Sequence, residues 1–333
     1  MRKVFIMSLS LFSIFLLSGC FGKGKEDVIG NFKKQLNKMD SYYLTGNLKI
    51  FNDEDHYAYD VEVSYKKDDN FRVSLKNKTN DHEQIILKNQ EGVYVLTPSL
   101  NKSFKFQSEW PYNNSQSYLL QTLLADIENE DNPKIIKKDD YKIVETKVIY
   151  SNNTSLVKQK IYFDEKANIK KVEVFDKENK VKIEMQFDEI KKNSKFDDDY
   201  FNLNSNMSMT NDQSVEETSK ELQDVLYPMY IPQDTYLASE DKVKTTAGER
   251  VILTFKGENP FTIVEETATA SKEHEVINVA GEPTILTDVV GSVSDNYITW
   301  VSNGVEYYAS STALDETELL QVAKSVTTQA LEK

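Results

Sequence analysis

Cysteine is almost absent from this sequence, since Cys20 is the only one among 333 residues. A single thiol cannot pair within the chain, so internal structural disulfides are excluded. Histidine is nearly as scarce. The three histidines, His56, His82 and His274, stand far apart, and none has a second His or Cys at metal-ligand spacing. We therefore expect no metal site and no cofactor.

The local signatures of common enzymes are missing too. The chain has no G-x-S-x-G, no G-x-G-x-x-G and no phosphate-binding P-loop motif. Acidic residues do cluster, as in Asp68–Asp69 and Asp197–Asp199, but these runs fall in polar stretches typical of solvated turns. We predict that the protein has no catalytic residues and is not an enzyme. The alternative is an active site assembled by the fold from scattered acids, which a sequence does not reveal.

Basic residues are outnumbered, with 40 Lys and Arg against 54 Asp and Glu, which gives a net charge of −14. Binding to a phosphate backbone normally needs a positive field, so we expect no nucleic-acid partner. The same balance gives no attraction to an anionic membrane surface. Attachment to a membrane therefore needs another device.

The N-terminus supplies such a device. Arg2 and Lys3 precede a 14-residue apolar run, Val4–Leu17, which is shorter than the roughly 20 residues that span a bilayer and is typical of an export signal. The run ends in Leu17-Ser18-Gly19-Cys20, which resembles the bacterial lipobox. The resemblance implies cleavage before Cys20 and acylation of its thiol. We expect a signal peptide over 1–19, a lipidated Cys20 with a linker over 20–25, and a position on the outer face of the cell membrane.

Apolar residues change their period along the chain. From Glu26 to Tyr42 they recur at helical spacing, which predicts an amphipathic helix. From Tyr57 onward they alternate with polar residues, which predicts strands with one buried face. The alternating runs include Tyr57–Tyr65, Phe71–Leu75, Ile161–Phe163, Val172–Val174 and Val181–Phe187. The pattern favours an α+β fold in which a curved, antiparallel, incomplete β-barrel is covered by helices.

One stretch links the sheet to its expected cover. Asn89–Pro111 holds two apolar runs around a Thr-Pro-Ser loop, and the leucine-rich run Ser117–Ile127 follows with an apolar face broad enough for a lid helix. The side chains that would fill the core or line a cavity under this lid are Val93, Val95, Phe104, Phe106, Trp110, Tyr118, Leu123 and Leu124. Core packing is the simpler interpretation, and a slot for an acyl chain is the alternative.

The composition turns polar and rich in Ser, Thr, Met and Asn over Asn204–Lys220, which we interpret as a domain boundary. We predict a half-barrel domain over 26–205, a linker over 206–226 with a helix at Val215–Leu226, and a small α+β domain over 227–333. The elements expected in this last domain are strands at Arg250–Phe255, Phe261–Glu265, Ile298–Val301 and Glu306–Ser310 and a closing helix at Glu316–Val326.

Two segments carry a resemblance to a known family. GVYVLTPSLNKSFKFQSEWP, followed by SYLLQTLLADI, is similar to the carrier-like lipoproteins of Gram-positive endospore-formers. These form a branch of the lipoprotein-localisation-factor (LolA-like) family that includes a germination lipoprotein. The resemblance covers roughly residues 26 to 205 and implies an N-terminal helix, an incomplete antiparallel barrel and helices that plug its concave side. YPMYIPQDTYL, together with ITWVSNGVEYYASSTALDETELLQVAKSV, resembles a second domain, of unassigned role, that is often fused to such lipoproteins.

Three functions follow as hypotheses. The first is a non-enzymatic, membrane-anchored envelope lipoprotein that binds a protein partner, in sporulation or germination as the resemblance implies, with a cell-wall hydrolase as the expected partner. The second is binding or carriage of a lipid or acyl chain in the half-barrel. The third is a regulator that binds an anti-sigma factor, because the layout is also similar to periplasmic regulators of that kind. A tethered carrier cannot shuttle between membranes, so the resemblance implies the fold more than the transport activity.

Overall fold

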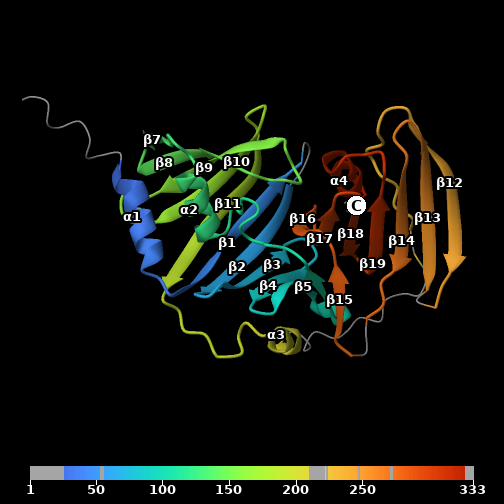
Figure 1. Ribbon diagram of the computed structural model, residues 1–333, viewed down its shortest axis with the longest axis horizontal. Helices are drawn as coiled ribbons and strands as arrows, with labels where there is room; N and C mark the ends of the chain where they lie inside the picture. Colours follow the sequence, from blue (N-terminus) through green and yellow to red (C-terminus); the bar gives the residue numbers. More distant parts are fainter. Residues whose placement is uncertain are drawn as a thin grey trace, which may run out of the picture.

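The computed structural model describes residues 26–52, 56–209, 222, 224–246, 248–270 and 273–326 (Figure 1). The expected signal peptide, Cys20 and the linker over 20–25 lie outside the described residues, as does most of the expected helix Val215–Leu226. The described end of that helix, Leu222 and 224–226, is not helical, so the prediction is wrong there. Leu226 instead donates its backbone N–H to the buried carboxylate of Glu265 over 3.1 Å, a donor that a continuing helix would use internally.

Twelve strands form the first sheet, in the order β15-β6-β5-β4-β3-β2-β1-β11-β10-β9-β8-β7. They are β1 (Ser41–Phe51), β2 (His56–Lys66), β3 (Asn70–Asn77), β4 (Glu83–Asn89), β5 (Gly92–Thr97), β6 (Lys102–Phe106), β7 (Lys134–Lys138), β8 (Tyr141–Lys147), β9 (Leu156–Phe163), β10 (Ile169–Asp176), β11 (Val181–Lys192) and β15 (Glu275–Val279). All pairs are antiparallel except β15 with β6. Since β7 and β15 end the sheet without pairing to each other, the predicted incomplete barrel is confirmed.

Local chemistry explains the regular strands of this sheet. In β2 the residues Tyr59, Val61 and Val63 are buried while Asp60 and Glu62 are exposed, as the alternating sequence predicts. The short turns between strands place Asp or Asn in the left-handed region, for example Asp68 at φ 65° between β2 and β3. These residue types tolerate that backbone conformation better than most others.

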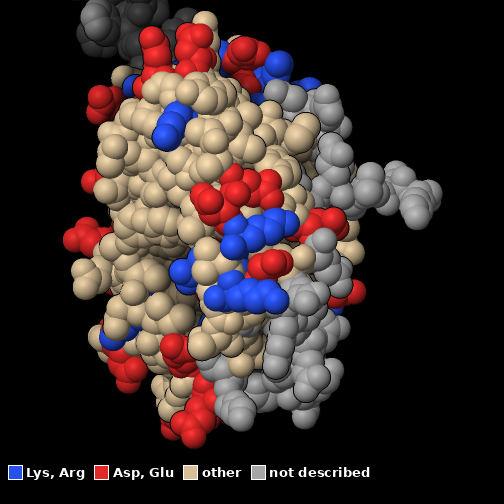
Figure 2. Space-filling view, turned by 90° about the vertical axis from the view of Figure 1, so that its right-hand side faces the viewer, with Lys and Arg blue, Asp and Glu red and all other residues tan. Residues whose placement is uncertain are grey.

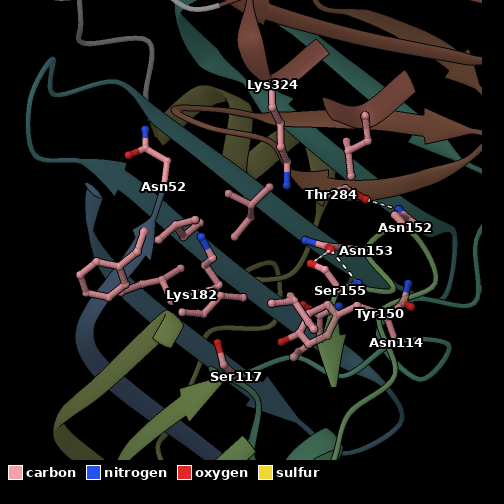
Figure 3. Close-up of a pocket in the computed structure, with 18 of the residues that line it drawn as sticks. Asn52, Asn114, Ser117, Tyr150, Asn152, Asn153, Ser155, Lys182, Thr284 and Lys324 are labelled. Carbon is pink, nitrogen blue, oxygen red and sulfur yellow. Dashed lines mark hydrogen bonds between the residues drawn. The ribbon is translucent and has the colours of Figure 1, made fainter. Parts of the chain in front are cut away.

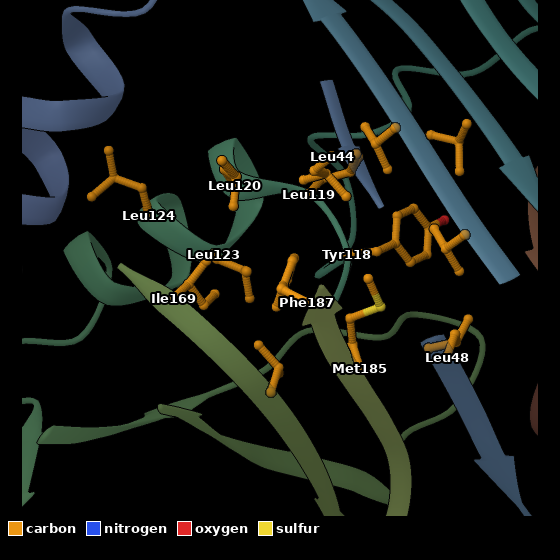
Figure 4. Packing of buried hydrophobic residues seen from close by; sticks show 14 of the residues in the cluster. Leu44, Leu48, Tyr118, Leu119, Leu120, Leu123, Leu124, Ile169, Met185 and Phe187 are labelled. Carbon is orange, nitrogen blue, oxygen red and sulfur yellow. The ribbon is translucent and has the colours of Figure 1, made fainter. Parts of the chain in front are cut away.

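Two helices cover the concave side of the sheet, α1 (Glu26–Asn37) and α2 (Leu120–Glu128) (Figure 1). Phe32 of α1 contacts Phe163 of β9, with ring centroids 5.1 Å apart. Leu123 of α2 is fully buried in the same hydrophobic cluster as Phe187 and Ile169 of the sheet (Figure 4). The lid helix expected at Ser117–Ile127 therefore exists, although it begins at Leu120.

The first helix is shorter than expected. The sequence predicts helix from Glu26 to Tyr42, but α1 ends at Asn37 and Tyr42 lies in β1. At this junction the apolar residues fit both the spacing of a helix and the alternation of a strand, so the sequence leaves the end of the helix open. The tertiary structure settles it, because Tyr42 and Leu44 face the core from alternate positions of a strand that pairs with both β2 and β11.

A short helix, α3 (Leu203–Met209), lies in the segment that the sequence marks as a polar boundary. Phe201 and Met207, near and within α3, pack against Ile85 and Leu96 on the convex face of β4 and β5. Strands β4 and β5 are thus buried on both faces, which explains why their apolar runs Ile85–Leu87 and Val93–Leu96 do not alternate with polar residues.

The second sheet is seven-stranded, in the order β12-β13-β14-β19-β18-β17-β16, and every neighbouring pair is antiparallel. Its strands are β12 (Thr235–Lys244), β13 (Glu249–Gly257), β14 (Phe261–Thr267), β16 (Glu282–Ile285), β17 (Val290–Ser294), β18 (Tyr297–Ser302) and β19 (Val305–Ser310). One helix, α4 (Glu316–Ser325), packs on it, and Asp315 caps α4 by accepting the N–H of Glu318 over 2.8 Å. The four expected strands and the closing helix are present, and β12, β15, β16 and β17 were not expected.

The two sheets are joined along one edge, side by side in Figure 1. Strand β15 comes from the predicted C-terminal domain yet pairs in parallel with β6, from Glu275 opposite Lys102 to Val279 opposite Phe106. Lys102 also forms an ion pair with Glu306 of β19, with its Nζ 2.5 Å from the carboxylate. The division of the chain at 206–226 stays a prediction, but the first sheet as described needs a strand from beyond it.

Candidate functional site

The residues singled out from the sequence lie mostly in the core. Val93, Val95 and Phe106 project from β5 and β6, Trp110 and Tyr118 lie in the loop before α2, and all five are buried. Phe104 is partly buried. Leu123 and Leu124 project from α2, with exposed fractions of 0% and 7%. The structure thus brings Trp110, Tyr118 and the two leucines into one hydrophobic cluster under the lid.

Beside this cluster, a cavity of about 400 Å³ opens between the first sheet and the second. Its volume lies within the range of roughly 300–1,000 Å³ typical of small-molecule sites. Tyr118 lines it, whereas Leu123 and Leu124 do not. The lining residues are Leu48, Ile50, Phe51, Asn52, Asn114, Gln116, Ser117, Tyr118, Tyr150, Asn152, Asn153, Ser155, Leu156, Lys182, Ile183, Pro283, Thr284, Ile285, Thr317, Leu320, Gln321 and Lys324. We call this space the interdomain cavity.

A buried polar network fixes the two loops on one side of the interdomain cavity. Ser115 donates its backbone N–H to the carbonyl of Ile149 over 2.7 Å, and Ile149 donates its N–H to Ser115 Oγ over 2.9 Å. Ser115 Oγ in turn donates to Asp126 Oδ1 over 2.9 Å, and Gln159 Nε2 donates to Asp126 Oδ2 over 2.7 Å. Burial raises the pKa of Asp126 to about 6. The loops before α2 and after β8 are therefore tied to the lid helix.

The second sheet closes the other side of the cavity. Asn152 of the β8–β9 loop donates through Nδ2 to Thr284 Oγ1 of β16 over 2.7 Å (Figure 3). Ser108 donates its hydroxyl to the carboxylate of Glu282, at the start of β16. Helix α4 contributes Leu320 and Lys324 from above. The cavity therefore exists only because the two sheets pack against each other.

Among the described residues that line the cavity, the polar side chains end in amide, hydroxyl and ammonium groups. Figure 3 shows Lys324 reaching from α4 into the cavity, with Lys182 of β11 across from it. Burial lowers the pKa of Lys324 to about 8 and raises the pKa of Tyr118 and of Tyr150 well above their usual range. At neutral pH the two phenols are therefore uncharged and the Lys324 ammonium is mostly charged.

A second cavity, of about 280 Å³, lies where β5 and β6 meet the second sheet. Val95, Phe104 and Phe106 line it from the first sheet, and Trp300 and Tyr307 line it from the second. The rings of Trp300 and Tyr307 stack with centroids 4.9 Å apart. Three of the residues singled out from the sequence thus face a space between the two sheets, not the space beneath the lid.

These arrangements are suited to binding. The side chains around the interdomain cavity offer an apolar wall with hydrogen-bond donors and positive charge. Within the described residues, no group of three or more His, Cys, Asp or Glu side chains could hold a metal ion. None of the helices in the described ranges is long and apolar enough to cross a membrane.

Comparison with known proteins shows to which family the chain belongs. A family model described as sporulation protein YdcC-like matches residues 1–201. The chain belongs to the YdcC-like sporulation protein family. The sporulation protein YdcC of Bacillus subtilis (strain 168) is 34% identical over 332 residues, which covers 99% of this chain and 98% of that protein. The family relationship expected from the sequence is therefore confirmed.

Two solved structures are similar at a much lower level. The LolA superfamily protein NE2245 from Nitrosomonas europaea aligns with a TM-score of 0.32 and 13% identity, over 54% of this chain and 98% of that one. A chain from the CwlD amidase of Clostridioides difficile in complex with the GerS lipoprotein aligns with a TM-score of 0.20 and 20% identity, over 54% and 98%. Likenesses this weak carry no conclusion about the function of the YdcC-like chain.

Sequence reasoning missed Lys182, Lys324, Asn152 and Thr284, which come from four separate elements. One local signal was available for Lys324. In the expected helix Glu316–Val326, Lys324 stands four residues after the buried Leu320 and so on the same apolar face. A lysine on the buried face of a helix is unusual enough to mark a candidate site.

Proposed function

We propose that this YdcC-like protein is a non-enzymatic lipoprotein, anchored by acylated Cys20 to the outer face of the cell membrane, that serves spore formation by binding a protein partner. The family supports the link to sporulation. The lipobox-like sequence supports the anchor. One structural observation supports the binding of a protein partner: an exposed apolar surface lies beside an unpaired sheet edge.

We call this surface the β12 surface and define it by Tyr227, Met229, Tyr230, Ile231, Tyr236, Leu237 and Val243. These seven are among the twelve exposed large hydrophobic residues of the described ranges. Met229 is 76% exposed and Tyr236 is 61% exposed. Figure 2 shows this end of the molecule, where uncharged surface is broad and charged side chains gather near the middle. Large exposed apolar patches mark interaction sites in soluble domains, and these seven side chains are the candidates for one.

The backbone of β12 suggests how a partner binds. Strand β12 ends its sheet, and among the described strands only β13 pairs with it, so the N–H and C=O groups of its other edge are open. An extended segment of the partner can add to this edge as a further strand. The sequence of β12 passes from Glu240 and Asp241 to Lys242 and Lys244, so a segment with the opposite order of charges fits it best.

The test is capture of the partner from membranes of sporulating cells. The tagged full-length protein is cross-linked and isolated, and retained envelope proteins are identified by mass spectrometry. We expect a cell-wall hydrolase or an anti-sigma factor to be retained by the wild type and lost with the double variant Met229→Glu/Tyr236→Glu. Ile149→Glu is the matched control, because Ile149 is 62% exposed on the other domain. Equal retention by the double variant and the wild type would rule out the β12 surface, and an empty wild-type sample would count against a protein partner.

The anchor is tested separately. Replacement Cys20→Ala should abolish attachment of a labelled fatty acid to the protein, because the thiol of Cys20 is the group that the lipobox-like sequence marks for acylation. A Cys20→Ala variant that still carries the labelled fatty acid would contradict the lipid anchor without bearing on the β12 surface.

Binding of an acyl chain is the second candidate function, and the interdomain cavity favours it. Leu48, Ile50 and Ile183 form an apolar wall on the side of the first sheet, and Ile285 and Leu320 face it from the second. Each methylene buried against such a wall contributes about 0.8 kcal/mol. The test is mass spectrometry of an organic extract of natively purified protein, in which a stoichiometric lipid supports this function and an empty extract speaks against it.

A further inference from the structure

We propose that one face of the second sheet binds a glycan strand, an unbranched chain of neutral sugars that lies across the β-strands. A row of hydroxyl side chains contacts the sugar hydroxyls, two stacked tyrosines support the sugar rings, and the cavity of about 280 Å³ beside β15 encloses part of the chain. This inference goes beyond the proposed function, because its ligand is a saccharide and its site lies away from the interdomain cavity.

The second sheet has one covered face and one open face. Helix α4 packs on the covered face, where Leu253, Ile263 and Ile298 are buried (Figure 1). Because successive side chains of a strand point to opposite sides, the residues between these positions lie on the other side of the sheet. We call that side the open face. Its composition indicates what kind of molecule it can bind.

A row of hydroxyl side chains crosses the open face. The strand register sets six of them opposite one another, one on each of six strands: Ser294 of β17, Tyr297 of β18, Ser310 of β19, Thr262 of β14, Thr254 of β13 and Ser239 of β12. None of the six is buried, and we call them the hydroxyl row. Neighbouring strands are about 4.8 Å apart, which is close to the length of one sugar unit in an extended β-1,4-linked glycan.

The hydroxyls of this row are available to a ligand. Within the described ranges, five of the six form no hydrogen bond to protein through the hydroxyl: Ser294, Tyr297, Ser310, Thr262 and Thr254. The sixth, Ser239, donates to Asp241 over 3.1 Å and can still accept a hydrogen bond. A hydroxyl both donates and accepts, and sugars carry the same group along their edges. The hydroxyl row can therefore exchange bound water for sugar hydroxyls on one strand after another.

Tyr297 and Tyr308 add an aromatic platform to the open face. Their ring centroids are 5.6 Å apart with the ring planes inclined by 23°, and Tyr308 is 39% exposed. The apolar face of a sugar ring packs on a flat aromatic surface, while the sugar hydroxyls point to the sides. Aromatic rings beside a row of hydroxyls therefore favour a glycan over a lipid, which has no polar groups along its chain.

The second cavity continues the site next to the hydroxyl row. One side of the cavity is a neighbouring row of the open face, formed by Ser292, Thr299, Tyr308 and Val264. Phe104 of β6 and Ile277 and Val279 of β15 line the opposite side. A cavity removes more of a ligand's surface from water than a flat face does. The combination of face and cavity can therefore hold an extended chain along its length and enclose part of it.

The charges that border this cavity are paired. Glu266 forms an ion pair with Arg250, and Glu306 forms one with Lys102, each with a nitrogen–oxygen distance of 2.5 Å. Among the described residues that line the cavity, these two glutamates are the only charged ones. A charged ligand would lose hydration here without gaining an unpaired counter-charge from these residues. The cavity is therefore suited to a neutral chain.

The test is calorimetric titration of the whole chain after the signal peptide, with Cys20→Ser so that it carries no lipid. The probes are chitohexaose, whose sugars bear acetamido groups, cellohexaose, whose sugars bear only hydroxyls, and their single units, N-acetylglucosamine and glucose. We expect at least one hexamer to bind about tenfold or more tightly than its single unit, because the hexamer contacts several strands. The hexamer that binds better shows which of these two kinds of glycan the site prefers.

Variants assign the binding to the open face. Tyr308→Ala removes a ring of the platform and should weaken binding of the hexamer about fivefold to tenfold, whereas Tyr308→Phe keeps the ring and should stay within about threefold of the wild type. Thr254→Val/Thr262→Val removes two hydroxyls of the row and should weaken binding about tenfold.

Matched controls come from the first sheet. Tyr141→Ala is the control for the ring, because Tyr141 is 40% exposed on β8. Thr45→Val is the control for the hydroxyls, because Thr45 is half-buried on β1. Both should bind the hexamer as the wild type does. Circular dichroism and thermal unfolding establish that each variant is folded.

Each outcome decides one point. Hexamer binding that Tyr308→Ala and the double threonine variant weaken, and that the controls leave unchanged, supports the inference. If neither hexamer binds the folded wild type, or if single sugars bind as tightly as the hexamers, the inference is overturned. Binding that both variants leave unchanged would mean a site elsewhere and would overturn it as well. The proposed function is independent of these outcomes, because no variant alters the β12 surface or the lining of the interdomain cavity.

Discussion

The side-chain amide of Gln84 pairs with the backbone of Val290 in the manner of a neighbouring strand. Gln84 Nε2 donates to the carbonyl of Val290 over 3.2 Å, and Val290 donates its N–H to Gln84 Oε1 over 2.5 Å. Both residues are buried, and Val290 belongs to the hydrophobic cluster of the first sheet although it lies in a strand of the second. This double hydrogen bond links the two sheets.

Replacement of Gln84 should therefore weaken the contact between the two sheets. Gln84→Ala removes two buried hydrogen bonds and leaves the N–H and C=O of Val290 unsatisfied, so we expect a loss of about 2–4 kcal/mol in the free energy of unfolding. Chemical denaturation followed by circular dichroism measures it. Gln90→Ala, at an exposed position, is the control and should cost much less. Equal stability of Gln84→Ala and the wild type would show that the two sheets are held together by other contacts.

Lys324 should lower the stability of the ligand-free protein. Its pKa falls to about 8 in the folded state, below its ordinary value, so the unfolded chain binds more protons between about pH 8 and pH 10.5 and stability rises with pH there. We expect Lys324→Met to raise the free energy of unfolding at pH 7 by about 1–3 kcal/mol and to remove that pH dependence. Urea titrations at pH 7 and pH 10 test both points. A destabilised Lys324→Met variant would mean that the ammonium group has a structural partner.

Glu265 should make the protein less stable as pH rises toward neutrality. Burial raises its pKa to about 7, although Leu226 donates a backbone N–H to it. A group whose folded pKa is raised contributes stability below its unfolded pKa, and this contribution is lost as pH rises through 7. We expect the free energy of unfolding to fall by about 2–3 kcal/mol between pH 4.5 and pH 7.5 from this group.

The variant Glu265→Gln isolates that effect. Glutamine keeps an oxygen that accepts the N–H of Leu226 but does not ionise, so the variant should be the more stable protein at pH 7.5. Asp126, with a pKa of about 6, adds a change of the same sign at lower pH, and Asp126→Asn/Glu265→Gln should flatten the profile further. An unchanged pH profile in both variants would contradict this assignment.

The region beneath the lid should behave as packed core. Leu123 has no exposed surface, so Leu123→Ala should cost about 3–4 kcal/mol, as truncation in a rigid core does. Leu237→Ala, at a position 39% exposed on β12, should cost less than about 0.5 kcal/mol. Thermal and urea unfolding measure both. A small effect of Leu123→Ala would indicate empty space under α2, and the acyl-chain site would then have to be sought there.

Local periodicity was a sufficient guide wherever one element has one buried face. Alternation predicted β2, β3 and β11, and helical spacing predicted α2 and α4, because the side-chain directions of a strand or helix follow from its own geometry. The edge strand β12 has the sequence TYLASEDKVK and was missed, because a strand exposed on both faces has no apolar alternation to detect.

The interdomain cavity could not be found in the same way. Lys182 and Lys324 are 142 positions apart. The place of Lys324 on an apolar helix face is a local signal, but no local pattern predicts that the two residues line the same cavity. Trp110, Leu123 and Leu124 were correctly recognised as apolar and central, but their sequence does not say whether they fill a core or border a space. That distinction depends on which side chains other elements bring against them.

By itself, the sequence determined the fold class, the order of the main strands, the lid helix, the lipobox-like N-terminus and the family resemblance. These features follow from the local periodicity of apolar residues, from the residue types found in turns and from short sequence motifs, none of which depends on distant contacts. Only the tertiary structure decided that β15 joins β6 in parallel, that Gln84 binds Val290, and that residues from β11, β16 and α4 line one cavity. The physical reason is that a pairing or a cavity belongs to surfaces from distant segments, and its charge and volume exist only once those surfaces are docked.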